Sequence, residues 1–91
     1  PARLKEQGYL VLPTAFTSAF SIWHYRQEEA RQLRFVTVYN AGGSMVYKRE
    51  FNANAEKLIS VDLSGQPAGT YIVTLGYNDS YRNVSERVIK R

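Results

Sequence analysis

The sequence contains few side chains with which a protein could carry out catalysis. An active site needs a nucleophile, an acid–base pair or a metal ion. The one histidine is His24, and there is no cysteine to share a metal ion with it. His24 lies in a segment of alternating residues, so we expect a structural, partly exposed histidine on a strand. Glu28 and Glu29 are adjacent, and adjacent side chains on an extended chain point in opposite directions, so they are not expected to act together.

Glycine-containing segments and Asn-x-Ser sequences are the other candidate sites. The segments 42–43 and 65–69 neither open a helix nor precede the Lys and Ser or Thr of a phosphate-binding loop. The segments 78–80 and 83–85 match the glycosylation sequence Asn-x-Ser, which is frequent by chance, and the first is expected to be a turn. We therefore expect no enzyme activity, no cofactor and no metal site.

The charge distribution and the lack of cysteine argue against further kinds of partner and site. Lys and Arg number 12 against 8 Asp and Glu, which gives a net charge of +4. The basic residues are scattered except for Arg82, Arg87, Lys90 and Arg91. Basic strand edges commonly prevent edge-to-edge pairing, so we expect no nucleic-acid partner. The absence of cysteine excludes disulfides and thiolate metal sites, and no apolar run approaches the roughly 20 residues of a membrane helix.

Short alternating segments, separated by turn residues, fill most of the chain. Hydrophobic residues make up 44% of the sequence, and seven Tyr and four Phe favour half-buried strands. Strands are predicted at 9–12, 19–24, 33–39, 45–51, 58–63, 71–77 and 84–89, and the polar segment 26–32 is expected to be a loop. The pattern predicts a single all-β, immunoglobulin-like antiparallel sandwich of about seven strands over residues 9–91. Residues 1–8 are expected to be a linker tail.

Two sequence motifs and the terminal strand together are similar to those of a known protein family. A strand ends in Asn40 and leads into a hairpin that contains Gly43. The second motif is a corner that reads Leu-Ser-Gly-Gln-Pro-Ala-Gly-Thr-Tyr from Leu63 to Tyr71, and the last five residues form a basic, hydrophobic strand end. This order resembles the type A C-terminal sorting domain carried by cargo of the Bacteroidetes type IX secretion system. The resemblance covers residues 9–91 and is sharpest over 36–91.

One segment departs from the family pattern. The family usually opens with a sequence like Tyr-Pro-Asn-Pro, whereas residues 12–16 read Leu-Pro-Thr-Ala-Phe and keep only Pro13. The resemblance implies that the sorting-motif and recognition residues of this chain are Pro13, Asn40, Gly43, Pro67, Gly69, Tyr71, Val88, Ile89, Lys90 and Arg91.

The resemblance implies a non-catalytic C-terminal secretion signal. It implies a cargo domain upstream, which passes through the periplasm and then reaches the outer-membrane surface or the medium. The implied partners are an outer-membrane shuttle protein and a sortase-like peptidase that cuts within or before residues 1–8. The hairpin from Tyr71 to Arg91 is expected to be the working surface, with an edge that could add a partner strand or support weak self-association.

Two other functions remain open from the sequence. A carbohydrate- or protein-binding module of a secreted enzyme would present an exposed aromatic row around Trp23, Tyr25, Tyr47 or Tyr77. A structural spacer between domains is the third, and it is disfavoured if Arg91 is the natural end of the chain.

Overall fold

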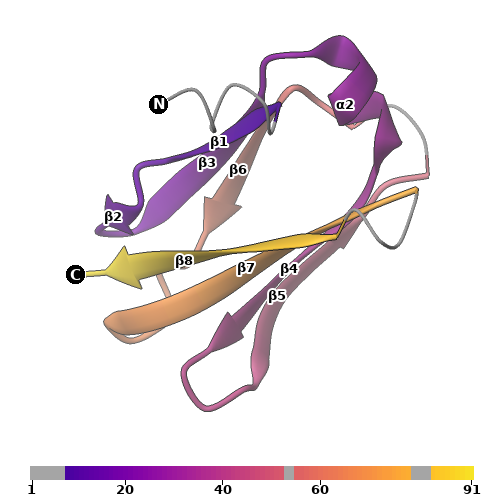
Figure 1. Ribbon diagram of the computed structural model, residues 1–91. Helices are drawn as coiled ribbons and strands as arrows, with labels where there is room; N and C mark the ends of the chain where they lie inside the picture. The colour runs from indigo at the N-terminus through magenta and orange to yellow at the C-terminus, as the bar shows by residue number, and fades with distance from the viewer. Residues whose placement is uncertain (1–7, 53–54, 79–82) are drawn as a thin grey trace.

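The computed structural model describes residues 8–52, 55–78 and 83–91, which form two stacked β-sheets (Figure 1). The elements in chain order are β1 (Tyr9–Leu12), β2 (Ala15–Phe16), β3 (Ala19–His24), α2 (Gln27–Gln32), β4 (Leu33–Asn40), β5 (Met45–Glu50), β6 (Leu58–Asp62), β7 (Gly69–Tyr77) and β8 (Val84–Lys90). The predicted all-β sandwich is confirmed. No helix in these ranges is long and apolar enough to cross a membrane.

The two sheets differ in size. The smaller has the strand order β1-β3-β6, and the larger has the order β2-β8-β7-β4-β5. All pairings are antiparallel except that of β2 with β8, which is parallel. The long strands β4 and β7 lie inside the larger sheet, which agrees with the apolar residues that the sequence has on both faces of β4.

Alternating residues supply the core between the sheets. Along β7, Tyr71, Val73 and Leu75 are buried, while the residues between them are only half-buried. Side chains in a strand alternate between its two faces, so one face of each strand packs inward. The smaller sheet contributes the facing residues, among them Phe20 and Ile59, both almost fully buried. In β3, β6 and β7 the alternation of residues in the sequence therefore matches the inward and outward faces of the strands.

The segment Arg26–Gln32 was expected to be a loop, and this prediction is wrong. Residues Gln27–Gln32 form the short helix α2, which packs against β3. Gln, Glu, Ala and Arg are all good helix formers, and Ala30 is fully buried, which holds the turn to the sandwich. The helix ends at Leu33, whose backbone N–H donates to the Ala30 carbonyl. Six residues are too few for the sequence pattern to show a helical period.

The expected count of about seven strands, all antiparallel, misses β2. This strand has only two residues, and Ala15 and Phe16 pair in parallel with Ile89 and Lys90 of β8. Phe16 is 3% exposed, so the short strand is fixed by burial of its ring as well as by pairing. A two-residue strand has no alternation to recognise. Residues 79–80 of the predicted turn lie outside the described residues, as do residues 1–7 of the predicted linker.

Candidate functional site

The structure brings motif residues from three strands into one row at one end of the larger sheet. Asn40 of β4 is paired with Tyr71 of β7, and Tyr71 is paired with Val88 of β8. Two positions further along the same pair of strands, Gly69 is paired with Lys90. Residues about 50 positions apart in the sequence therefore lie side by side, which the sequence motifs alone did not establish.

Asn40 closes the hairpin that follows β4. Its side-chain Oδ1 accepts the backbone N–H of Ser44 at 2.9 Å, and its carbonyl accepts the N–H of Gly43 at 3.0 Å. Gly43 has a φ of 88°, in the left-handed region where a Cβ is unfavourable. The Asn and Gly of this motif are thus explained by the turn that they build.

The corner between β6 and β7 is fixed by side-chain bonds at both ends. Asp62 Oδ1 accepts the Ser64 N–H at 2.9 Å, and this bond lowers the pKa of the Asp62 carboxyl. At the other end, the Tyr71 hydroxyl donates to the Pro67 carbonyl at 2.5 Å. Gly69, between them, has a φ of 150°. A tyrosine at the start of a strand that bonds back to the preceding corner also occurs in immunoglobulin-type sandwiches.

The hairpin and the corner enclose a small hollow. It has a volume of about 220 Å³ and is lined by the segments 40–42 and 67–71. Pro67, Ala68 and Gly69 are exposed, whereas the ring of Tyr71 is 2% exposed and forms part of the core. The motif residues therefore include both surface groups and groups that only hold the surface in shape.

The segment after Pro13 reaches this same end of the sandwich through β2. Pro13 itself is exposed and follows a cis peptide bond. The next residue, Thr14, accepts the N–H of Ile89 at 2.8 Å, and Phe16 accepts the N–H of Arg91 at 2.8 Å. The short β2 thus covers the outer edge of the last residues of β8. In the sequence, only the single proline marks this segment.

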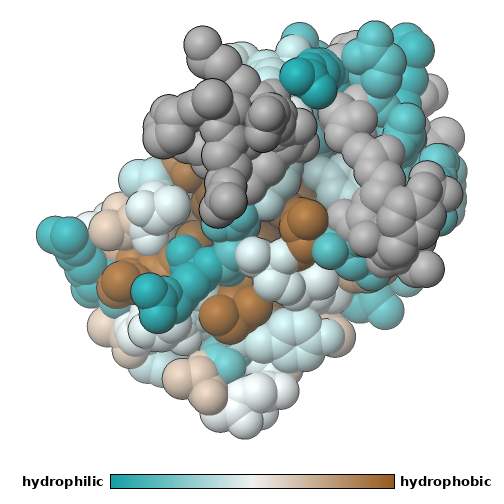
Figure 2. Space-filling model, in the orientation of Figure 1, coloured by the Kyte–Doolittle hydropathy of each residue, from teal (hydrophilic) through white to brown (hydrophobic). Residues whose placement is uncertain are grey.

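The terminal strand β8 and the residue after it combine buried and exposed side chains. Val88 is fully buried in the core, whereas Ile89 is 47% exposed and Arg91 is exposed. On the core side, Glu86 accepts the hydroxyl of Tyr9 at 2.7 Å. Figure 2 shows apolar and polar side chains interleaved over the part of the surface where β7 and β8 lie. The strand therefore combines a structural residue with exposed apolar and basic groups.

The exposed aromatic row expected of a binding module forms only in part. Trp23 and Tyr25 lie together, with ring centroids 5.4 Å apart. Tyr77, however, is 7% exposed and its hydroxyl lies 2.8 Å from His24 Nε2, while Tyr47 packs half-buried against the core. His24 itself is fully buried, so its expected partial exposure is wrong. The inward position of His24 in β3 explains both corrections, because Tyr77 faces it across the core.

Titratable groups in the described part of the chain do not gather into a metal site. No three His, Asp or Glu side chains among these residues are close enough to hold a metal ion. Burial raises the pKa of Tyr9 far above its ordinary value, and the bond to Glu86 raises it further. This pair joins β1 to β8 across the sandwich, which is a structural role.

The fold and the site define a β-sandwich domain whose sequence motifs converge on one end and on the terminal strand. The model of the family described as the secretion system C-terminal sorting domain matches residues 13–91, so the chain belongs to this family. No curated protein matches the sequence. Membership makes this domain a sorting signal of the type IX secretion system, which directs export to the outer membrane or cell surface by interacting with the secretion machinery.

Proposed function

We propose that this domain is a non-catalytic C-terminal signal that is removed from its cargo at the cell surface. The cargo first enters the periplasm, and an outer-membrane shuttle protein then binds the domain. A sortase-like peptidase cuts the chain within or before residues 1–8. The observation that carries the proposal is the convergence of Asn40, Pro67, Gly69 and the β8 end on one surface in a chain of this family.

The recognition surface in this proposal is the end of the sandwich around the hollow. Its side-chain contacts come from the exposed Ile89 and Arg91 and the half-exposed Lys90. An apolar group beside two cations suits an acidic, partly apolar surface of the partner. Asn40, Gly69 and Tyr71 support it by fixing the hairpin and the corner.

Strand addition is proposed at a different part of β8 from its last residues. Among the described strands, β2 pairs with Ile89 and Lys90, so that part of the edge is occupied. The outer edge from Val84 to Arg87 has no strand partner in the described ranges. Backbone groups on such an edge can pair with an extended segment of another protein. Weak self-association of two domains is proposed at the same edge.

A secretion reporter tests the proposal. Residues 1–91 are fused to the C-terminus of a fluorescent protein that carries a signal peptide, in a host with a functional type IX system. We expect fluorescence at the cell surface or in the medium, with the domain cleaved off, and periplasmic retention in a host that lacks the system. Retention of the reporter in the competent host would refute the proposal.

A charge-reversal variant distinguishes a loss of recognition from a loss of folding. Removal of residues 88–91 would also remove Val88, which is fully buried, so a deletion could act through unfolding. The double variant Lys90→Glu/Arg91→Glu leaves Val88 in place and is expected to trap the reporter in the periplasm. The control Arg31→Glu/Lys48→Glu makes the same charge change at exposed positions away from this end, and should export normally. Equal export of both variants would exclude the basic terminus from the signal.

A further inference from the structure

The hollow between the hairpin and the corner, here called the hairpin–corner hollow, lies where the pairing of β4 with β7 ends. Asn40 is the last residue of β4 and is paired with Tyr71, whereas β7 begins two residues earlier, at Gly69. On its other side β7 is paired from its first residue, because Gly69 is paired with Lys90 of β8. Among the described strands, Thr70 therefore has β8 on one side and no neighbour on the β4 side.

The backbone groups of Thr70 point toward the side that has no strand. In an antiparallel sheet, the N–H and the carbonyl of one residue point to the same side, and successive residues alternate. The Asn40 N–H donates to the Ser44 carbonyl at 2.9 Å, and the Asn40 carbonyl accepts the Gly43 N–H at 3.0 Å, so both groups point toward β5. Tyr71, opposite Asn40, therefore pairs with β8. Its neighbour Thr70 then directs both backbone groups to the β4 side.

Two backbone bonds at other places agree with this direction. Ile89 is paired with Thr70, and the Ile89 N–H donates to Thr14, away from β7. At the far end of β7, the Asn78 N–H donates to the Gln32 carbonyl, just before β4 begins. Asn78 and Thr70 are separated by an even number of positions, so their backbone groups point to the same side. Thr70 thus offers one N–H donor and one carbonyl acceptor to the hairpin–corner hollow, which it lines.

The size and the lining of the hairpin–corner hollow suit a short piece of polypeptide. Its volume of about 220 Å³ lies below the range of about 300–1,000 Å³ that is typical of small-molecule sites. Asn40 Oδ1 is bonded to Ser44, and the Tyr71 hydroxyl is bonded to Pro67, so these side chains are already used in the turns. The backbone of Thr70 remains as a donor and acceptor pair in strand geometry. Such a pair is complementary to another extended chain.

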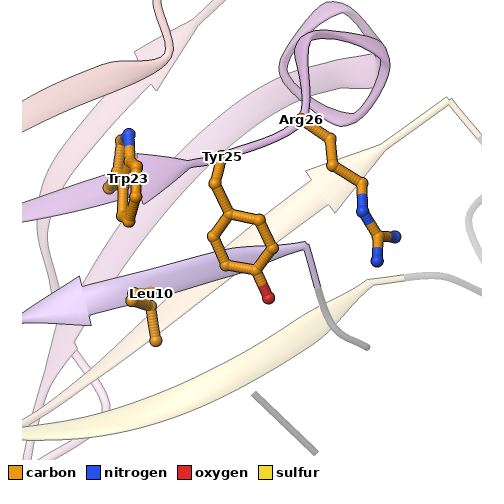
Figure 3. A pocket seen from close by; sticks show the side chains of 4 residues that line it. All are labelled: Leu10, Trp23, Tyr25 and Arg26. Atoms are coloured by element: carbon orange, nitrogen blue, oxygen red, sulfur yellow. The ribbon is translucent and has the colours of Figure 1, made fainter. Parts of the chain in front are cut away.

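A larger hollow on the smaller sheet is of a different kind (Figure 3). It has a volume of about 460 Å³, and its walls are the side chains of Leu10, Trp23, Tyr25 and Arg26. All four residues of β1 beside it are paired with β3, so the pairing of these two strands does not stop at this hollow as that of β4 and β7 stops at Asn40. The backbone therefore identifies an occupant for the hairpin–corner hollow and not for the larger one.

We propose that the hairpin–corner hollow binds a short extended segment of a protein of the secretion machinery, whose backbone pairs with Thr70 in line with β4. One residue of the segment donates its N–H to the Thr70 carbonyl and accepts the Thr70 N–H, as in a hydrogen-bonded antiparallel pair. Asn40 occupies the next position, opposite Tyr71, so the segment ends or turns away there. The paired residue has a small side chain, because the hollow has little volume. The identity of the partner rests on the proposed function, whereas the pairing itself does not.

Nuclear magnetic resonance titration of the ¹⁵N-labelled 91-residue chain tests the pairing. The probe is acetyl-alanine methylamide, which carries the N–H and the carbonyl of one residue. Its matched control has a methyl group on the alanine nitrogen and so lacks that donor. We expect the probe to shift the Thr70 amide signal, and the indole signal of Trp23, the one Trp of the chain, to stay unchanged. The control should bind about fivefold more weakly, through loss of one hydrogen bond; equal binding of the two would overturn the proposal.

Proline substitutions remove one backbone donor at a time. Thr70→Pro removes the N–H that faces the hollow, so the chain should stay folded and bind the probe at least fivefold more weakly. Ile72→Pro removes an N–H that points to Tyr39 of β4, and should abolish the dispersed spectrum of the folded chain. Lys48→Pro is the matched control. The Phe51 N–H donates toward β4, so that of Lys48 points to the outer edge of β5, and this variant should bind like the parent. Unfolding of Thr70→Pro would contradict the assigned direction of its N–H.

The secretion reporter distinguishes failure of this proposal from failure of the proposed function. We expect export of the parent and Lys48→Pro fusions, and periplasmic retention of the Thr70→Pro fusion. Export of Thr70→Pro at the level of the parent would overturn the role of the hollow and leave the sorting function intact. Retention of the parent fusion would refute the sorting function, while the peptide titration would still decide whether Thr70 pairs with an extended segment.

Discussion

The hydroxyl of Tyr71 donates to the carbonyl of Pro67 at 2.5 Å, so the first long residue of β7 closes the corner that precedes it. The ring of Tyr71 is 2% exposed, and the row that it forms with Asn40 and Val88 crosses three strands. One residue therefore joins the corner, the hairpin strand and the terminal strand. The corner is held from inside the core, which explains how exposed residues such as Pro67 can keep a fixed position.

The Tyr71→Phe variant tests this bond. It keeps the buried ring and removes the hydroxyl, so the free energy of unfolding should fall by about 1 kcal/mol. Urea unfolding followed by tryptophan fluorescence measures the change. Tyr39→Phe, at a half-buried position in β4, is the control and should change stability by less than about 0.5 kcal/mol. Equal effects of the two variants would show that the bond to Pro67 does not stabilise the corner.

Gly76 is a position at which a side chain has no room. A Cβ at Gly76 would lie 2.0 Å from Phe35 Cε2, because the Phe35 ring covers the glycine on the adjacent strand. Gly76→Ala should therefore lower the free energy of unfolding by about 1 kcal/mol, as the ring must move. In a Phe35→Ala background the same change should be neutral or slightly stabilising, since Ala suits a strand better than Gly. Thermal or urea unfolding of the four proteins completes this double-mutant cycle; additive effects would contradict the contact.

The hydrogen bond between the buried Tyr9 and the half-buried Glu86 should make the fold sensitive to alkali. Burial, and then Glu86, raise the pKa of the Tyr9 phenol above the ordinary value of 10.0. The folded state therefore keeps a proton that the unfolded chain releases. Its contribution is fully present below pH 10 and is lost as the pH rises above that value, by up to about 1.4 kcal/mol per pH unit.

Urea unfolding between pH 8 and pH 11 measures this loss. Tyr9→Phe should lower stability at pH 8, through loss of the bond to Glu86, but should decline less steeply above pH 10. Tyr47→Phe, at a half-buried position in β5, should keep the parent slope. An unchanged slope in Tyr9→Phe would assign the alkaline loss to other groups.

Hydrogen exchange tests whether β2 covers the end of β8. The Ile89 N–H donates to Thr14 at 2.8 Å, so it should exchange slowly. Backbone groups alternate in direction along an antiparallel strand, so the N–H of Arg87 points to the same edge beyond the reach of β2, and should exchange rapidly. Truncation of the ring in Phe16→Ala should release the Ile89 amide if the protein stays folded. Equal protection of Ile89 and Arg87 would contradict the pairing with β2.

The sequence by itself determined the sandwich and most of its strands. Alternation places Phe20, Ile59 and Val73 inward whatever their neighbours are, because side chains in a strand alternate strictly between two faces. The turns at 40–43 and 63–69 are also local, since Asn40, Asp62 and Gly69 act on residues next to them. The resemblance to sorting domains used these same local motifs, and the family match over residues 13–91 agrees with it.

Only the tertiary structure decided which distant groups meet. The two-residue β2 exists because Phe16 is buried and the end of β8 lies beside it, and neither condition can be seen in a two-residue pattern. The burial of His24 depends on Tyr77 across the core, and α2 depends on a buried site for Ala30. Local sequence fixes the direction of a side chain, but its burial and its partners depend on elements that fold onto it from far along the chain. The pairing of Asn40, Tyr71 and Val88 in one row likewise depends on the tertiary structure, because the three residues come from strands far apart in the sequence.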